Sequence, residues 1–367
     1  MTETRRLDDS WYLGSLRVPN RVMLAPLAGI GNWFVRLQAK RYGAGMAVSE
    51  MVSSHAIHHR NDKTCNEMLR IDPRERDPGA PAPGGPVSIQ LFGEDPAVMR
   101  EAAAVVVACG ADAIDINMGC PVPKVRKTGA GAALLDDPDL AVAVARATVE
   151  GARDAAAGRD AAGAGGSGAG GIPVTVKLRS GVRPGDDSGF ELAHRLVAEA
   201  DVAAIGFHPR SAAVHHKGAP DYQLAARLVQ SLPAPVILTG GMDDADSVRE
   251  AFASTGAAAV MLARGALGNP WLFAELLHDP DHQQRAPGPT REQVLAELHW
   301  TLACAVEHLG EQRATRYLRK FYPWYMPRLQ LDTRAAKELQ ESLQSAPTLA
   351  EVRELLDAAC TPAALAV

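Results

Sequence analysis

Eight short apolar segments recur along this chain of 367 residues, and each is followed by a stretch with the pattern of an amphipathic helix. The segments cover residues 21–26, 45–51, 86–92, 113–119, 173–181, 203–210, 235–241 and 258–265. The stretches between them, such as DPAVMREAAAVVVACGA, begin at Asp or Pro and end at Gly, which are start and stop signals of helices. Strand alternating with helix eight times predicts an α/β fold, a (β/α)8 TIM barrel. A doubly wound open sheet is the alternative, but eight regular units favour a closed barrel.

The chain continues beyond the eighth unit without a further strand pattern. Amphipathic helices separated by LGEQ and LQLDT are expected there, so we predict two domains: a barrel over residues 1–288 and a small C-terminal helical bundle over 289–367. The segment WYLGSLRVPNR at 11–21 predicts a hairpin that closes the barrel floor, and 77–85 predicts a Pro/Gly loop. A low-complexity insertion covers about 152–172. Its Gly/Ala-rich part, 158–171, predicts a flexible loop before the fifth strand, on the face opposite the expected site.

Composition and charge exclude several classes of protein. A formal net charge of −5 gives no overall attraction for nucleic acid, so RNA contact would need local basic patches. The N-terminus lacks the apolar core of a signal peptide, and no apolar run is long enough to span a bilayer. The five cysteines are scattered, odd in number and never spaced C-x-x-C, which argues against disulfides or zinc. We expect no metal, no membrane association and a cytoplasmic location.

Alternation within the strands predicts which side chains face the barrel interior. If the apolar set packs against the helices, the third to sixth strands turn these polar residues inward: Ser88, Gln90, Asp115, Asn117, Thr175, Lys177, Arg179, His208 and Arg210. They gather toward the carboxyl ends of the strands, where barrel enzymes build their sites. Because a buried Lys or Asn needs a polar partner, the pattern predicts an anionic ligand at this end of the barrel.

A thiol follows the fourth strand, in the stretch INMGCPVPKV. Gly119 allows a sharp turn after the strand, and Pro121 and Pro123 stiffen the loop that carries Cys120. A cysteine over the barrel mouth can act as a nucleophile or a proton donor. The alternative is a small apolar residue that fills a gap. We interpret the remaining cysteines as packing residues: Cys65, Cys109, Cys304 and Cys360.

The last two strands end in glycine-containing stretches, TGG at 239–241 and ARG at 263–265. Gly-Gly alone is more often a turn. At the seventh and eighth strands of a barrel, however, such stretches are typical of a phosphate site. Backbone N–H groups there, together with Arg264, could hold a phosphomonoester.

Several of these motifs resemble one family. APLAG, SIQLFG, DINMGCPVPKV, TGAGAALL, VTVKLRSG, GFHPR and MLARGALGNPW are similar to the tRNA-dihydrouridine synthases, flavoproteins that reduce uridine in tRNA, and most of all to the bacterial B-type branch. The resemblance runs from about residue 14 into the C-terminal helices, and NMGCP followed by AGAALL is its specific part. It implies FMN as the cofactor of the barrel, NADPH or NADH as a transient reductant, and tRNA as the partner of the helical domain.

The resemblance also implies roles for individual residues. The flavin would be contacted by Pro26, Leu27, Ala28, Gln90, Asn117, Lys177 and His208, and the FMN phosphate by Thr239, Gly240, Gly241, Ala263 and Arg264. Three positions depart from the family pattern, which usually has Asn-Gly-Asp at 239–241, Gly-Arg at 263–264 and His-Gly-Arg at 208–210. Any phosphate contact made by the missing Asn or Asp side chain is therefore lost here.

Reduction of the C5–C6 bond of uracil adds a hydride at C6 and a proton at C5. The resemblance implies that the flavin supplies the hydride and Cys120 the proton, since a thiol with a pKa of about 8.5 is mostly protonated near neutral pH. The uridine must be flipped out of folded tRNA. We expect RNA contacts from Lys124, Arg126, Arg179, Arg210, Arg313, Arg316 and Lys320. The FYPWY aromatics at 321–325 would either stack on bases or form the bundle core.

Two other functions remain open at this stage. Another FMN-dependent barrel oxidoreductase, acting on a free pyrimidine or an enone, would not need a basic helical tail. A non-catalytic RNA-binding factor would not need Cys120, Lys177 and His208 together.

Overall fold

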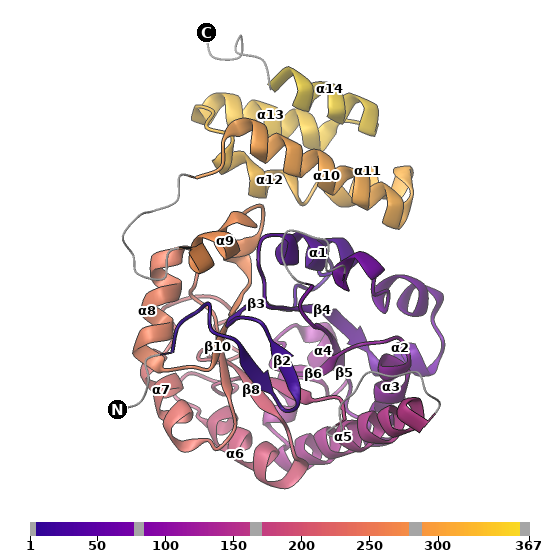
Figure 1. The fold of residues 1–367 in the computed structure, drawn as a ribbon, viewed down its shortest axis with the longest axis vertical. Helices are drawn as coiled ribbons and strands as arrows, with labels where there is room; N and C mark the ends of the chain where they lie inside the picture. Colours follow the sequence, from indigo (N-terminus) through magenta and orange to yellow (C-terminus); the bar gives the residue numbers. More distant parts are fainter. Residues whose placement is uncertain (1–4, 77–83, 162–170, 279–287, 360–367) are drawn as a thin grey trace.

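A closed barrel of eight parallel strands forms the centre of the molecule (Figure 1). The computed structural model describes residues 5–76, 84–161, 171–278 and 288–359. The strands are β3 (Val22–Leu24), β4 (Met46–Ser53), β5 (Val87–Phe92), β6 (Ala113–Met118), β7 (Val174–Arg179), β8 (Ala204–His208), β9 (Val236–Thr239) and β10 (Ala259–Leu262). Each strand coincides with one of the eight predicted segments, and β10 pairs with β3 to close the sheet. The prediction of a (β/α)8 barrel is therefore confirmed.

Helices surround the barrel. They are α1 (Trp33–Arg41), α2 (Ser54–His58), α3 (Pro96–Ala108), α4 (Pro123–Arg126), α5 (Pro138–Ala161), α6 (Ser188–Ala200), α7 (Tyr222–Ser231), α8 (Ala245–Thr255) and α9 (Trp271–His278). The start signals act as expected: the Asp95 carboxylate accepts hydrogen bonds from the N–H groups of Ala97 and Val98, and Asp244 caps α8. Helix α5 continues to Ala161, so the loop predicted from residue 158 begins later, because alanine sustains a helix. Residues 162–170 of that loop, and 77–83 of the Pro/Gly loop, lie outside the described residues.

The barrel interior has two levels. At the amino ends of the strands it is apolar, with Met23, Met46, Ala113 and Ala259 buried in one cluster. The predicted hairpin, β1 (Trp11–Leu13) paired with β2 (Leu16–Val18), packs into the same cluster and closes the floor. At the carboxyl ends the interior is polar. The apolar residues of the same strands pack outward against the helices, as predicted.

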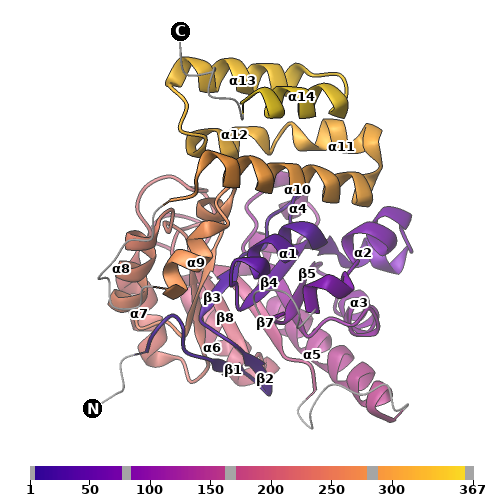
Figure 2. The ribbon, with the colours of Figure 1, turned by 45° about the horizontal axis from the view of Figure 1, so that its top comes forward.

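The C-terminal helices stack outside the ring of barrel helices, beside α1, with α10 nearest to it (Figures 1 and 2). They are α10 (Arg291–Leu309), α11 (Glu311–Leu318), α12 (Tyr322–Tyr325), α13 (Thr333–Ser345) and α14 (Leu349–Ala359). Phe321, Tyr322 and Tyr325 are buried, so these aromatics belong to the core and are not available for stacking on bases.

A buried polar cluster joins the helical region to the barrel. Gln38 of α1 donates hydrogen bonds to Glu297 (2.8 Å) and to Tyr325 (3.0 Å). The Glu297 carboxylate also accepts from Arg41 and Tyr42, and only 4% of the residue is exposed. Because both oxygens of the Glu297 carboxylate accept hydrogen bonds and Arg41 supplies the opposite charge, the cluster joins the two regions without leaving a buried charge unpaired.

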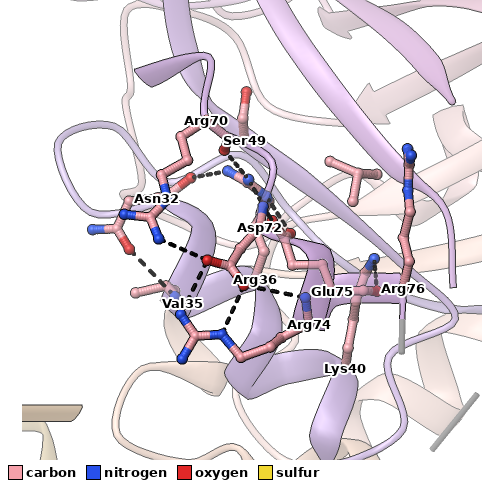
Figure 3. A network of polar contacts seen from close by, with 12 residues as sticks. Asn32, Val35, Arg36, Lys40, Ser49, Arg70, Asp72, Arg74, Glu75 and Arg76 are labelled. Atoms are coloured by element: carbon pink, nitrogen blue, oxygen red, sulfur yellow. Dashed lines mark hydrogen bonds and ion pairs between the residues drawn. The ribbon is translucent and has the colours of Figure 1, made fainter. Parts of the chain in front are cut away.

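A second network anchors the segment that follows α2 (Figure 3). Arg36 forms a fully buried, two-pronged pair with Glu75, at 2.8 and 2.9 Å. Arg70 and Arg74 both bind Asp72 and, across the boundary, Glu307 of α10. Asp72 carries a pKa lowered to about 2, mainly by its hydrogen bonds to Arg74.

Candidate active site

A cavity of about 230 Å³ opens at the carboxyl ends of the barrel strands. Its lining includes every residue predicted to contact flavin or phosphate, namely Pro26, Leu27, Ala28, Gln90, Asn117, Lys177, His208, Thr239, Gly240, Gly241, Ala263 and Arg264, and also Cys120. Alternation placed the strand residues there, because inward side chains at the strand ends converge on the barrel axis. The structure thus brings the predicted site residues together, while their roles stay predictions.

One wall of the cavity is a chain of side-chain hydrogen bonds across β5, β6 and β7. Asn117 donates from Nδ2 to Oε1 of Gln90 at 2.9 Å, and Gln90 donates from Nε2 to Asp115 at 2.6 Å. Thr175 lies on the other side of Asp115, with its hydroxyl 2.5 Å from the carboxylate. These residues are neighbours in the strand register, which is why the contacts form.

The Cys120 loop is attached to this wall and to the segment behind it. Asn117 Oδ1 accepts from the backbone N–H of Cys120 at 2.9 Å, and Ala132 N–H donates to the Cys120 carbonyl at 3.1 Å. Gly131 has a φ of +63°, and a Cβ there would lie 2.9 Å from the Cys120 carbonyl oxygen. The AGAALL stretch therefore needs its glycine in order to pack under the cysteine.

Lys177 extends from β7 into the cavity. Its ammonium group forms no hydrogen bond or ion pair with any residue that the structure describes. Burial, and after it the charge of nearby Arg179, lower its pKa to about 8, whereas Asp115 opposes the shift. An unpartnered ammonium facing a cavity is stabilised by an anionic ligand, which is the kind of ligand predicted from the sequence.

His208 carries its proton on one identifiable nitrogen. The Arg210 guanidinium lies 3.1 Å from Nε2 of His208, and since a guanidinium only donates, Nε2 must accept. The proton of the neutral ring is then on Nδ1. Burial, followed by the charge of Lys177, lowers the pKa of His208 well below its usual range. His216 stacks on this ring with centroids 6.0 Å apart.

Two arginines predicted to contact RNA brace the cavity wall. Arg179 is 4% exposed and donates to the carbonyl groups of Gly119, Ser211 and His215. Arg210 is 8% exposed and donates to Gly218 as well as to His208. Both hold loops around the cavity mouth, and RNA contact by either one stays a prediction.

The opposite wall is made of backbone. Gly240 and Gly241 have φ values of +101° and +80°. A Cβ on Gly240 would lie 2.5 Å from His208, and one on Gly241 would lie 2.7 Å from Pro220. Tyr222 donates its hydroxyl to the Gly240 carbonyl at 2.8 Å, which fixes the turn. Arg264 is exposed beside it and has no partner among the described residues. Two glycines and a free guanidinium form a cradle that suits an anion.

The other predicted RNA contacts lie outside the cavity. Lys124 and Arg126 are exposed on α4, directly after Cys120, and Arg126 is 3.6 Å from Asp136. Arg313, Arg316 and Lys320 line a second hollow, of about 350 Å³, between the barrel loops and α11. Arg313 pairs with Glu67 at 2.7 Å, and Lys320 donates to the Gly29 carbonyl at 2.6 Å.

Sequence reasoning missed several residues of the cavity lining: Met51, His216, Met242, Asp243 and Met261. Met261 follows from the inward alternation of its strand, a signal we could have used. Met51 does not, because a register shift in β4 between Val48 and Met51 breaks the alternation that starts at Met46 and Val48. His216 and Asp243 come from loops, whose paths no periodicity fixes. One interpretation is wrong: Cys109 is exposed at the end of α3 and is not a core residue, whereas Cys304 is buried. Cys65 is partly buried, and Cys360 lies outside the described residues.

Two searches covered only the residues that the structure describes. Within those ranges, no three His, Cys, Asp or Glu side chains are arranged to hold a metal ion. No helix in the same part of the chain has the length and apolar character needed to cross a membrane.

Comparison with known proteins identifies relatives over most of the chain. Residues 23–364 match the family model described as dihydrouridine synthase. A probable tRNA-dihydrouridine synthase 1 from Synechocystis is 35% identical over 360 residues, covering 96% of this chain and 90% of the relative. A tRNA-dihydrouridine synthase B from Pseudomonas aeruginosa is 33% identical over 86% of this chain and 87% of its own length. Among solved structures, a 2-naphthoyl-CoA reductase complex superposes with a TM-score of 0.53 at 13% identity, over 75% of this chain and 52% of that one. That similarity concerns the fold alone.

Proposed function

The chain belongs to the dihydrouridine synthase family, and from this premise we propose that it reduces the C5–C6 bond of uridine in tRNA to 5,6-dihydrouridine, using FMN and NADPH or NADH. The observation that carries the proposal is the meeting of Cys120, the unpartnered Lys177 and the glycine cradle in one cavity. A proton source, a charge that attracts an anion and a phosphate site are the three features that this chemistry requires.

The residues present fit FMN. The cradle at Gly240 and Gly241, with Arg264 beside it, would hold the phosphate. Lys177, Gln90, Asn117 and His208, together with Pro26–Ala28, would contact the ring system. The departures from the family pattern at 239–241 remove side-chain contacts but keep the backbone N–H groups. When bound, FMN would carry two electrons from the nicotinamide to C6 of the uracil as a hydride.

The side chains of this protein would supply the remaining steps. Cys120 would donate the proton that C5 needs, and its loop is held in place by Asn117 and Arg179. Lys177 would stabilise the negative charge that develops on the ring system during the transfer of electrons. His208, neutral and protonated on Nδ1, would offer a hydrogen-bond donor but no positive charge.

We propose tRNA as the partner because basic residues flank the cavity on both sides. Lys124 and Arg126 lie on α4 next to Cys120, and Arg316 is exposed on α11 with no partner among the described residues. Lys320 and Arg313 already have partners in the protein, at Gly29 and Glu67, so Arg316 is the residue most free to bind a phosphate.

The experiment is reduction of tRNA isolated from a strain without dihydrouridine. Purified protein, NADPH and this tRNA should yield a nucleoside that has gained two hydrogens, detected by mass spectrometry after nuclease digestion. Reduction of free uridine or of an enone, with no change in the tRNA, would favour the alternative barrel oxidoreductase. A protein that binds tRNA but never binds flavin would point to a non-catalytic RNA-binding factor.

A further inference from the structure

Asp115 is a carboxylate in an unusual place, 1% exposed in the middle of the barrel and outside the cavity lining. Burial raises its pKa to about 6, while hydrogen bonds from Thr175 and Gln90 favour the ionised form. A buried carboxylate of this kind is costly to keep unless its hydrogen bonds serve a purpose. The proposed reaction gives Asp115 no role.

The directions of the hydrogen bonds from Cys120 down to Asp115 are all determined. The backbone N–H groups of Gly119 and Cys120 can only donate, so the atom of Asn117 that faces them must be its oxygen. The Asn117 amide nitrogen therefore faces Gln90, and the Gln90 atom that receives it must be its oxygen as well. The Gln90 nitrogen is then left to face the next residue, which must accept. A carboxylate accepts in any orientation, and this position holds Asp115.

We propose that Asp115 is a positioning residue, which fixes the Cys120 loop through a one-directional chain of hydrogen bonds running over Gln90 and Asn117. The chain joins the centre of the barrel to the backbone of the thiol-bearing residue through three consecutive contacts of 2.6, 2.9 and 2.9 Å. Without an acceptor at residue 115, the Gln90 amide is free to turn over. It would then present its nitrogen to the Asn117 nitrogen, and the loop would lose its anchor.

Two substitutions separate this role from simple filling of space. Asp115→Asn has the same shape, and its amide oxygen can still accept from Gln90 while its nitrogen donates to the Thr175 hydroxyl. Asp115→Leu keeps the branching at Cγ, with two methyl groups in place of the two carboxylate oxygens; it is larger than Asp and cannot accept a hydrogen bond. Ser88→Ala is the matched control, because Ser88 is fully buried on β5 and its hydroxyl has no hydrogen-bond partner among the described residues.

The readout is the reactivity of the Cys120 thiol, measured on the purified full-length chain as the rate of iodoacetamide alkylation of the Cys120 peptide. Asp115→Leu should raise this rate about threefold or more, because the loop is loosened. It should also lower kcat/KM for tRNA by about tenfold or more, since displaced groups near a reaction centre commonly cost 10- to 100-fold. Asp115→Asn and Ser88→Ala should stay within about twofold of the wild type in both measurements.

A second set of variants covers the case in which Asp115→Leu does not fold. Gln90→Glu places two carboxylates opposite each other. In alkaline solution, where both are ionised, it should change the alkylation rate of Cys120. Adding Asp115→Asn to that variant restores a donor opposite an acceptor and should return the rate toward the wild-type value. Equal rates in the single and double variants would overturn the proposal.

The catalytic part of this inference rests on the proposed function, whereas alkylation needs neither flavin nor tRNA. If Asp115→Leu folds and keeps the wild-type alkylation rate and kcat/KM, Asp115 does not position the loop. If Asp115→Leu changes alkylation but the wild type never reduces tRNA, the hydrogen-bond chain stands and the proposed function fails.

Discussion

The two walls of the cavity are built in different ways. Across β5–β7 the wall consists of side chains, with Gln90 and Asn117 at the cavity and Asp115 behind them, joined by hydrogen bonds. At the ends of β9 and β10 the wall is backbone, shaped by Gly240 and Gly241 in conformations that only glycine adopts readily. The side-chain wall depends on chemical identity at each position. The backbone wall depends on the absence of side chains, which explains how Thr239 and Gly241 can stand where the family usually has Asn and Asp.

The largest effect is expected on the side-chain wall, at the thiol that it supports. Cys120→Ala should keep bound flavin and its reduction by NADPH, but lose about 10²- to 10⁴-fold in tRNA reduction, the usual contribution of a general acid. Single-turnover oxidation of the reduced enzyme by tRNA measures this step. A Cys120→Ala enzyme with near wild-type turnover would remove Cys120 from the role of acid.

The backbone wall is tested by adding a single carbon atom. Gly240→Ala should weaken flavin binding about 10-fold or more, because strained backbone of this kind costs about 1–3 kcal/mol. The new Cβ would also lie 2.5 Å from His208. The control is Gly256→Ala, where φ is +66° and the nearest atom is 3.9 Å away, at the end of α8. Equal flavin affinity in both variants, measured by fluorescence titration, would show that the cradle does not hold the cofactor.

Lys177 extends from β7 into the cavity between the two walls. The burial of its ammonium group changes the stability of the protein with pH in a direction that can be worked out. The unfolded chain keeps the Lys177 proton up to pH 10.5, whereas the folded protein releases it near a pKa of about 8. Between these values the unfolded state binds more protons, so stability rises with pH. Lys177→Met should therefore stabilise the flavin-free protein at neutral pH by about 3 kcal/mol, and this gain should shrink in alkaline solution.

Urea unfolding across pH measures the difference, with Lys217→Met as the control because Lys217 is exposed. The same Lys177→Met substitution should weaken flavin binding. A Lys177→Met protein that is less stable than the wild type at neutral pH, with unchanged flavin affinity, would contradict both predictions: that the buried ammonium group destabilises the flavin-free protein, and that it attracts the flavin.

The smallest effect is expected outside both walls. Arg316→Ala should weaken tRNA binding a few-fold and reduce the slope of log affinity against log salt by about 1, as expected for one lost phosphate contact. Arg353→Ala on α14 is the matched control, since Arg353 is exposed and has no partner among the described residues. Salt series that coincide for the two variants would leave α11 without a role in RNA binding. Flavin reduction by NADPH should be unchanged in both.

Periodicity predicted the fold and the polar strand residues of the cavity, because alternation assigns each strand residue to a face. The contacts expected at Pro26–Ala28 came from the family resemblance instead. The contacts of Gln90 and Lys177 with their surroundings follow from the face and the strand order. Periodicity could not predict which groups the far end of a long side chain contacts. Arg179 and Arg210 were predicted as RNA contacts, and in the structure both bind loop carbonyls farther along the chain. Aromatic residues 321–325 were ambiguous for the same reason, since composition does not distinguish a core residue from a stacking platform.

The cluster around Glu297 bears on how the chain acquires its structure. Glu297, Gln38 and Tyr325 are buried between α10, α12 and the barrel helix α1, beside the large apolar side chains Trp33 and Phe34. A barrel ending at residue 288 would leave the Gln38 amide without partners and uncover part of this aromatic surface. The barrel alone therefore leaves polar and aromatic groups of α1 uncovered, even though its sheet is closed. Synthesis of the last eighty or so residues completes it, and the full chain should melt in one cooperative transition.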